Sequence, residues 1–171
     1  MDDIELAYLA GVLDSDGFFS VRRTTYHMRV RGDARQPMYQ ERIGIKQVSP
    51  IAVEMLKARF GGHMQRHKPS TRNGKWLHGW DATDRIAAAV ALTLLPYLRI
   101  KREQAGLLLI LRSYKDAPLK QPEVMNVVCR WGYAVPTRRW VWTPEESARR
   151  EALWLRCREL NDVHPQPAQL I

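Results

Sequence analysis

Small residues along the N-terminal segment follow the repeat of an amphipathic helix. Between residues 4 and 14, Ala7, Ala10, Gly11 and Asp14 recur at the i, i+3, i+4, i+7 spacing that places side chains on one helix face. A face made of alanine and glycine usually lies close to another backbone, because it offers no large side chain of its own. The pattern predicts a helix over 4–14 that packs closely through this face.

The next two segments alternate between apolar and polar residues with a period of two. Phe19 and Val21 fall on one side of segment 18–31, as Ile43 does in segment 39–48, while the other side of each segment is polar and rich in arginine. This alternation is typical of half-buried strands. We expect the two strands to form a hairpin with one core face and one polar face.

Turn and capping signals divide the following residues into further elements. Ser49-Pro50 is a helix start, and Gly61-Gly62 is a helix stop. The predicted elements are a helix at about 51–60, a hairpin of 63–68 with 76–82 around the Asn73-Gly74 turn, a helix from 84 to 95 and another from 100 to about 114. The resulting α+β order is αββαββα.

Beyond Pro118 the composition shifts towards proline, tryptophan and arginine. We predict a helix near 122–131 and a last helix that opens with the capping box at Thr143 to Glu146 and ends near Asn161. The sequence therefore predicts a core domain over residues 1–117 and a C-terminal helical extension over residues 118–171.

The charge of the chain points to a polyanionic partner. Lys and Arg number 27 against 18 Asp and Glu, which gives a net charge of +9 and a pI near 9.9. Against this background, Asp14 and Asp16 stand at the end of the first helix, where the helix carbonyls disfavour negative charge by about 0.3–1 kcal/mol. Two acids there predict a positive partner, for which a metal ion is the candidate.

Other features of composition place the chain inside a cell. No run approaches the roughly 18 apolar residues that span a bilayer, and no charged-then-apolar leader opens the chain, so we expect a cytoplasmic protein with no membrane partner. Cys129 and Cys157 suit a reducing compartment and are expected to be buried or inert. The excess of arginine over lysine hints at a GC-rich bacterial or phage genome.

At this point the sequence resembles the LAGLIDADG homing endonuclease family. Residues 9–17, LAGVLDSDG, agree with the nine-letter motif at six positions, and the αββαββα order agrees as well. Further landmarks follow in order over residues 4–114, namely Gln47 at the end of the second strand, Phe60-Gly61-Gly62, Leu95-Pro96-Tyr97-Leu98 and Lys101-Arg102-Glu103-Gln104-Ala105.

The resemblance implies a sequence-specific double-strand DNA endonuclease with a saddle-shaped antiparallel sheet and helices on one face. A chain with one motif is implied to act as a homodimer, with Ala7, Ala10, Gly11 and Asp14 at the dimer interface. Asp16, with the carbonyl of Ser15, is implied to hold Mg²⁺; Mn²⁺ is expected to substitute, and Ca²⁺ to bind without supporting cleavage. Gln47 and Lys101 match positions that organise charge and water around the scissile phosphate, so the implied catalytic residues are Asp16, Gln47 and Lys101.

The polar side of the predicted hairpins supplies candidates for DNA contact, because a two-stranded ribbon fits the major groove. The candidates are Ser20, Arg22, Thr24, Tyr26, Gln40, Arg42, Lys46, Arg66 and Lys68. Gly44 on the same face predicts a gap that water fills. Arg138-Arg139 is expected to reach flanking phosphate. Two equal subunits would read a long pseudo-palindromic site, and the resemblance implies short 3′ overhangs. The expected origin is a mobile intron or an intein-free reading frame.

Blander interpretations of these features stay open at this stage. The small-residue helix could be an ordinary packed helix, and the arginine-rich strands a solvated sheet face. Core packing or base stacking could explain Trp76, His78 and Trp80, which share one strand face, and core packing is favoured. A packing role is likewise expected for the tryptophans near the C-terminus, Trp131, Trp140, Trp142 and Trp154. Two rival functions share the fold: an intron RNA maturase, and a DNA-binding regulator without catalysis.

Overall fold

The structure, a computed structural model, describes residues 2–25, 36–69, 73–128 and 131–162. Its elements in chain order are α1 (Asp3–Asp16), β1 (Gly17–Thr24), β2 (Met38–Gln47), α2 (Ile51–Phe60), β3 (His63–His67), β4 (Leu77–Thr83), α3 (Asp84–Leu94), α4 (Arg102–Asp116), β5 (Lys120–Val128), β6 (Ala134–Trp142) and α5 (Pro144–Asp162). The predicted αββαββα order of the first seven elements is confirmed. Within these residues, no helix is both long and apolar enough to cross a membrane.

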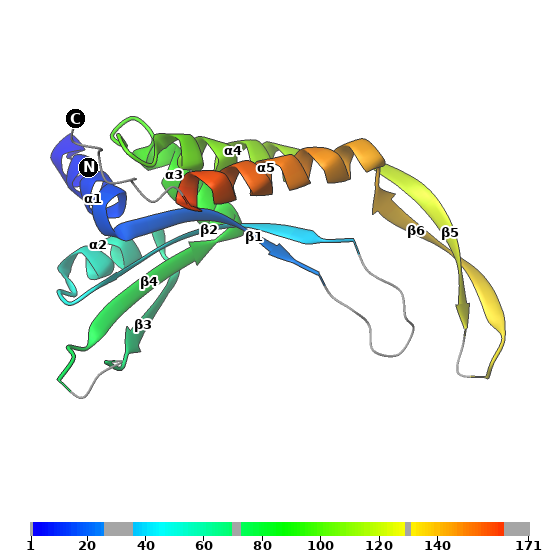
Figure 1. Cartoon of the computed structure of the whole chain (residues 1–171), viewed down its shortest axis with the longest axis horizontal. Coiled ribbons are helices and arrows are strands. Elements are labelled where there is room, and N and C mark those ends of the chain that lie inside the picture. Colours follow the sequence, from blue (N-terminus) through cyan, green and yellow to red (C-terminus); the bar gives the residue numbers. More distant parts are fainter. Residues whose placement is uncertain (1, 26–35, 70–72, 129–130, 163–171) are drawn as a thin grey trace, which may run out of the picture.

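The first four strands form one antiparallel sheet in the order β1-β2-β4-β3. Figure 1 shows the helices on one side of this sheet, while its strands bend away from the helices so that the free face is concave. The α+β order was predicted from the sequence patterns, and the one-sided placement of the helices was implied by the family resemblance.

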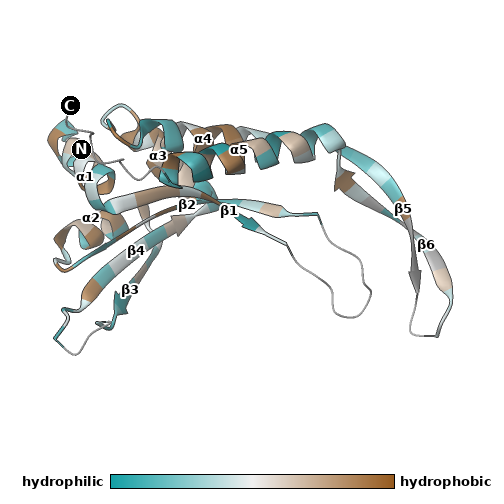
Figure 2. Ribbon diagram, viewed as in Figure 1, coloured by the Kyte–Doolittle hydropathy of each residue, from teal (hydrophilic) through white to brown (hydrophobic). Residues whose placement is uncertain are grey.

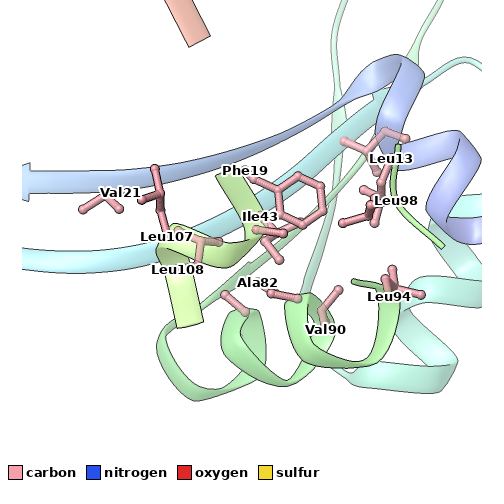
Figure 3. Close-up of a cluster of buried hydrophobic side chains, with 14 of the residues drawn as sticks. Leu13, Phe19, Val21, Ile43, Ala82, Val90, Leu94, Leu98, Leu107 and Leu108 are labelled. Carbon is pink, nitrogen blue, oxygen red and sulfur yellow. The ribbon is translucent and has the colours of Figure 1, made fainter. Parts of the chain in front are cut away.

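The core lies between the helices and the inward face of the sheet. Phe19 and Ile43 are opposite one another in the β1–β2 register and are completely buried, as the period-two pattern requires. In Figure 3, Phe19 lies beside Ile43, among side chains from the helices and Leu98 from the connection between α3 and α4. Figure 2 shows the hydrophobic residues gathered on the helices and the strand segments beside them, whereas β3 is mostly hydrophilic.

Two glycines end α2 and turn the chain into β3. Gly61 and Gly62 have φ angles of 77° and 80°, a region that side chains with a Cβ rarely adopt. A Cβ on Gly62 would also lie 2.7 Å from the carbonyl oxygen of Asp81. The predicted stop at Gly61-Gly62 therefore has both a conformational and a steric cause.

The C-terminal segment differs from the prediction. Residues 120–128 form strand β5 rather than a helix, and they pair with β6 in a separate two-stranded sheet. The reason is local: three valines in nine residues favour the extended conformation, and Pro122 is tolerated at a sheet edge. The last helix is confirmed, and α5 adds Leu153 and Cys157 to the main core. The division into domains at residue 118 stays a prediction.

Tryptophan and cysteine placement is mixed. Trp80 is buried, and Trp142 and Trp154 pack against the core as expected. Trp131 and Trp140 are 81% and 69% exposed, so the prediction of a packing role for them is wrong. The structure has them on the β5–β6 hairpin, which covers no core of its own. Cys157 is buried, whereas Cys129 lies outside the described residues.

Candidate active site

The two acids at the end of α1 have different surroundings. Asp14 is buried, and its carboxylate accepts backbone N–H groups from Arg99, Ile100 and Lys101 at 2.6, 3.2 and 2.9 Å. These donors precede the first turn of α4, so one negative charge joins the end of α1 to the start of α4. Charge-assisted hydrogen bonds of this kind are about twice as strong as neutral ones.

Lys101 is the positive partner that the helix end requires. Its Nζ donates to the carbonyl oxygens of Leu13, Asp14 and Ser15 at 3.0, 2.6 and 3.4 Å. The last carbonyls of a helix lack helical partners and carry partial negative charge, so an ammonium group there stabilises α1. Burial lowers the pKa of Lys101 below its ordinary value, and the charges of Asp14 and Asp16 oppose that shift.

Asp16 is exposed and stands at the edge of a surface depression. Gln47, the last residue of β2, donates from Nε2 to one oxygen of Asp16 at 2.8 Å. The depression is also lined by Tyr8, Lys46 and Val48. The amide orients the carboxylate and leaves it accessible. Asp16, Gln47 and Lys101 lie together at the C-terminal end of α1, and their catalytic roles stay a prediction from the family resemblance.

The oxygen atoms at Asp16 suit a metal ion, but one chain supplies only part of the ligand set that such an ion needs. No group of three or more His, Cys, Asp or Glu side chains that could hold a metal occurs among the described residues. The chain offers the Asp16 carboxylate and the Ser15 carbonyl, which already accepts the long hydrogen bond from Lys101. Mg²⁺ commonly takes one or two carboxylates, several waters and substrate phosphate, so this oxygen pair suits it if other groups complete the shell.

The exposed face of α1 is rotated from the predicted one. Ala7 and Gly11 are exposed, with nothing within 4 Å of a Cβ built on Gly11, but Ala10 and Asp14 are buried within the same chain. Ala10 packs in the core beside Leu9 and Leu13, because one helix face must cover the sheet. The free face is instead formed by Ile4, Ala7, Tyr8 and Gly11, which we call the α1 free face.

The concave face of the sheet carries most of the predicted DNA contacts. Ser20, Arg22, Thr24, Arg42 and Lys46 alternate with the buried residues of β1 and β2 and so lie on this face. Tyr26 lies outside the described residues. Gln40 belongs to the same side, but its amide donates to Asp84 at 2.6 Å. Lys68 is exposed just after β3.

Strand register separates Arg66 from this set. Arg66 is opposite His78, two residues from the buried Trp80, so it lies on the face away from Lys46 and stacks over Trp76 at 4.5 Å. Gln65 and His67 occupy the concave face instead, and both line a hollow there with Arg42 and Lys46. Sequence reasoning missed these two residues, because the register of this hairpin depends on its loop.

Phe18 fills the gap that was predicted at Gly44. A Cβ on Gly44 would lie 2.7 Å from the Phe18 ring, so the glycine makes room for that ring rather than for water. The guanidinium of Arg42 lies 5.6 Å from the centre of the same ring. Stacking of this kind limits the positions that Arg42 can take over the concave face.

Comparison with solved structures identifies the architecture: the chain has the fold of the LAGLIDADG homing endonucleases. The homing endonuclease I-CvuI in complex with a DNA target matches with a TM-score of 0.64 and 15% identity over 96% of this chain and 87% of that one. The archaeal intron-encoded homing endonuclease I-Vdi141I, complexed with DNA, matches with a TM-score of 0.59 and 13% identity over 100% and 91%.

A longer protein of the same class also matches. Meganuclease I-SmaMI bound to uncleaveable DNA has a TM-score of 0.51 and 16% identity over 87% of this chain but only 43% of that one. No protein-family model matches the sequence, and neither does any curated protein. The likeness therefore lies in three-dimensional structure far more than in sequence.

Proposed function

We propose that two copies of this chain pair through the α1 free face and act as a sequence-specific double-strand DNA endonuclease. The observation that carries the proposal is the position of Asp16. It is an exposed carboxylate, oriented by Gln47, at the end of a helix whose free face is largely apolar and is not covered by the described residues of this chain. Pairing about a twofold axis along that face would bring two copies of Asp16 together.

The structural neighbours support a DNA substrate and a paired assembly. I-CvuI and I-Vdi141I were both solved with DNA, and each is similar in length to this chain. I-SmaMI, which this chain matches over less than half of its length, has room for two such units in one polypeptide. A chain with one motif helix would gain the second by dimerisation.

Each residue of the site has a role in this proposal. Asp16, with the Ser15 carbonyl, would hold Mg²⁺, which supplies charge stabilisation and an activated water for phosphodiester hydrolysis when bound. Gln47 orients the Asp16 carboxylate, and Lys101 neutralises the end of α1 that carries both ligands. Asp14 keeps Lys101 in place through the backbone preceding α4. Mn²⁺ should substitute for Mg²⁺, while Ca²⁺ should bind without supporting cleavage.

Recognition of the target is assigned to the concave face. Its described basic residues, Arg22, Arg42 and Lys46, surround polar side chains that can contact base edges, among them Ser20 and Thr24. Paired chains would read two half-sites of a long pseudo-palindrome. The family resemblance implies short 3′ overhangs after cleavage.

The test begins with a duplex that the wild-type protein selects from a randomised library. We expect cleavage of both strands with Mg²⁺ and binding alone with Ca²⁺. Asp16→Asn should bind this duplex but not cut it, whereas Asp116→Asn, which removes an exposed carboxylate on α4, should cut normally. Binding of the selected duplex without cleavage in Mg²⁺ would favour the non-catalytic regulator, and selection of structured RNA over DNA would favour the maturase.

A further inference from the structure

The β5–β6 hairpin, which we call the arm, leaves the body of the protein and exposes large aromatic rings. Trp131, Tyr133 and Trp140 are 81%, 73% and 69% exposed, more than any other aromatic side chain among the described residues. Exposed rings on an isolated two-stranded sheet are unfavourable in water, and such a hairpin is only marginally stable by itself. The arm therefore has the properties of a surface that another molecule covers.

The base of the arm is fixed to the body, so its direction is set by the fold. The backbone of Trp142 exchanges two hydrogen bonds with the side chain of Gln36, at 2.9 and 3.1 Å. The Trp142 ring packs on Tyr39 and lies 4.1 Å from the guanidinium of Arg150. Just before β5, the N–H of Leu119 donates to the buried carboxylate of Glu146. An arm held at both strands can present its residues in a defined place.

The arm bends to the side of the molecule that the helices leave free. Figure 1 shows β5 and β6 running out from the start of α5 and curving towards the side of the concave face, beyond the ends of β1 and β2. Helix α1, which carries the α1 free face, lies at the opposite end of the molecule in Figure 1. In the proposed dimer the arm would therefore stand at the outer end of each half-site.

The charge of the arm indicates which class of molecule covers it. Segment 118–143 contains four basic residues and one acidic residue. Arg138, Trp140 and Val124 are exposed on one face of the ribbon, since Val124 is opposite Arg138 in the register and residues 138 and 140 are two apart. An exposed arginine beside exposed aromatic rings suits a phosphate backbone and a DNA groove, whereas a purely apolar partner would make no use of the excess positive charge.

We propose that the arm grips duplex DNA outside the half-site read by the four-stranded sheet, with Arg138 on phosphate and the rings at the tip of the arm, Trp131 and Tyr133, against the groove. This inference rests on the proposed function, because it takes the concave face as the DNA surface that the arm continues. A ribbon is thin enough to enter a groove, and apolar wedges at base steps are a known way to hold flanking DNA.

The experiment measures how affinity depends on the length of DNA flanking the selected site, in Ca²⁺ so that no duplex is cut. For the wild type, affinity should rise as flanks are added and then reach a plateau. The double variant Trp131→Ala/Tyr133→Ala should lose about tenfold or more in affinity for long duplexes, because it removes buried aromatic area from the groove, and none for the shortest. Arg138→Gln should reduce the slope of log affinity against log salt concentration by about one, because one phosphate contact is lost.

Controls separate this inference from folding and from the proposed function. Leu92→Ala removes an exposed apolar side chain from α3, and Arg158→Gln removes an exposed charge from α5; neither should alter the flank dependence. Thermal unfolding of each arm variant should match the wild type. Equal flank dependence in wild type and arm variants would overturn the role of the arm while leaving the endonuclease intact. If the arm variants fail to dimerise but each dimer still binds DNA like the wild type, the arm contacts a second copy of the chain, and its proposed role on DNA is overturned. Failure of the wild type to bind any duplex would overturn the proposed function itself.

Discussion

The most informative substitution is Asp14→Asn, because we expect it to lower stability, whereas the matching change at the other motif acid, Asp16, should leave stability unchanged. The Asp14 carboxylate is buried and accepts three backbone N–H groups, two on one oxygen and one on the other. Asparagine has a single acceptor oxygen, so its NH₂ group must face at least one of those donors. The variant also loses the charge that strengthens the bonds that remain.

The size of the effect follows from these bonds. Losing one hydrogen bond to a charged group costs about 1.5–3 kcal/mol. The contact between the Asn NH₂ and a backbone N–H adds to that cost, as does the weakening of the hydrogen bonds that remain. We therefore expect a loss of about 3 kcal/mol in the free energy of unfolding. For a chain of this length, that corresponds to a fall of about 6–12 °C in Tm.

The assay is urea denaturation together with thermal unfolding at neutral pH and fixed protein concentration, with Asp16→Asn as the matched control. Asp16 is exposed and accepts a hydrogen bond from the Gln47 amide, so the free energy of unfolding of its variant should lie within about 0.5 kcal/mol of the wild-type value. Equal stability of the two variants would refute the assignment of a structural role to Asp14 and a chemical role to Asp16.

Three further outcomes follow from single contacts. Lys101→Met should lower the free energy of unfolding by about 2 kcal/mol and reduce cleavage more than binding, because three carbonyls of α1 lose their donor; urea denaturation and cleavage rates test this. Gly62→Ala should destabilise by about 2 kcal/mol or more in the same denaturation assay, whereas Gly106→Ala in α4, where a Cβ meets nothing within 4 Å, should not. Burial and the hydrogen bond to Glu151 raise the pKa of Tyr39 to about 12, so its contribution to stability is complete below about pH 10 and lost as pH rises through 12. The free energy of unfolding of Tyr39→Phe should therefore change less than that of the wild type between about pH 10 and 12. The same pH dependence in both proteins would contradict the raised pKa of Tyr39.

Much of the core could be predicted because local sequence determines it: the alternation around Phe19 and Ile43 sets which strand face is buried. The grouping of Gln47 and Lys101 with Asp16 was not set by a local pattern and was implied by the family resemblance alone. What Lys101 does there was not predictable, because its bonds to the α1 carbonyls depend on how α4 approaches α1. The family motif located the residues, and the packing determined their contacts.

The failures have common physical causes. Ala10 repeats with Ala7 in the sequence, but 3.6 residues per turn leave the two side chains about 60° apart, enough to bury one and expose the other. The face of Arg66 depends on a register that loop length sets. Strand β5 contains a proline in a short segment, where helix and strand patterns are hard to separate, and its partner β6 lies across the turn.

The central claim is that two copies of Asp16 meet across paired α1 helices, and a distance between chains tests it most directly. A spin label on Ser15→Cys, with Cys129 and Cys157 replaced, would sit next to Asp16 on an exposed position. Packed helices lie about 8–10 Å apart, so electron-spin distance measurements on the DNA-bound protein should give a narrow separation of about 10–25 Å once the label arms are included. No dipolar coupling between chains in that complex, or a separation well beyond this range, would contradict the account.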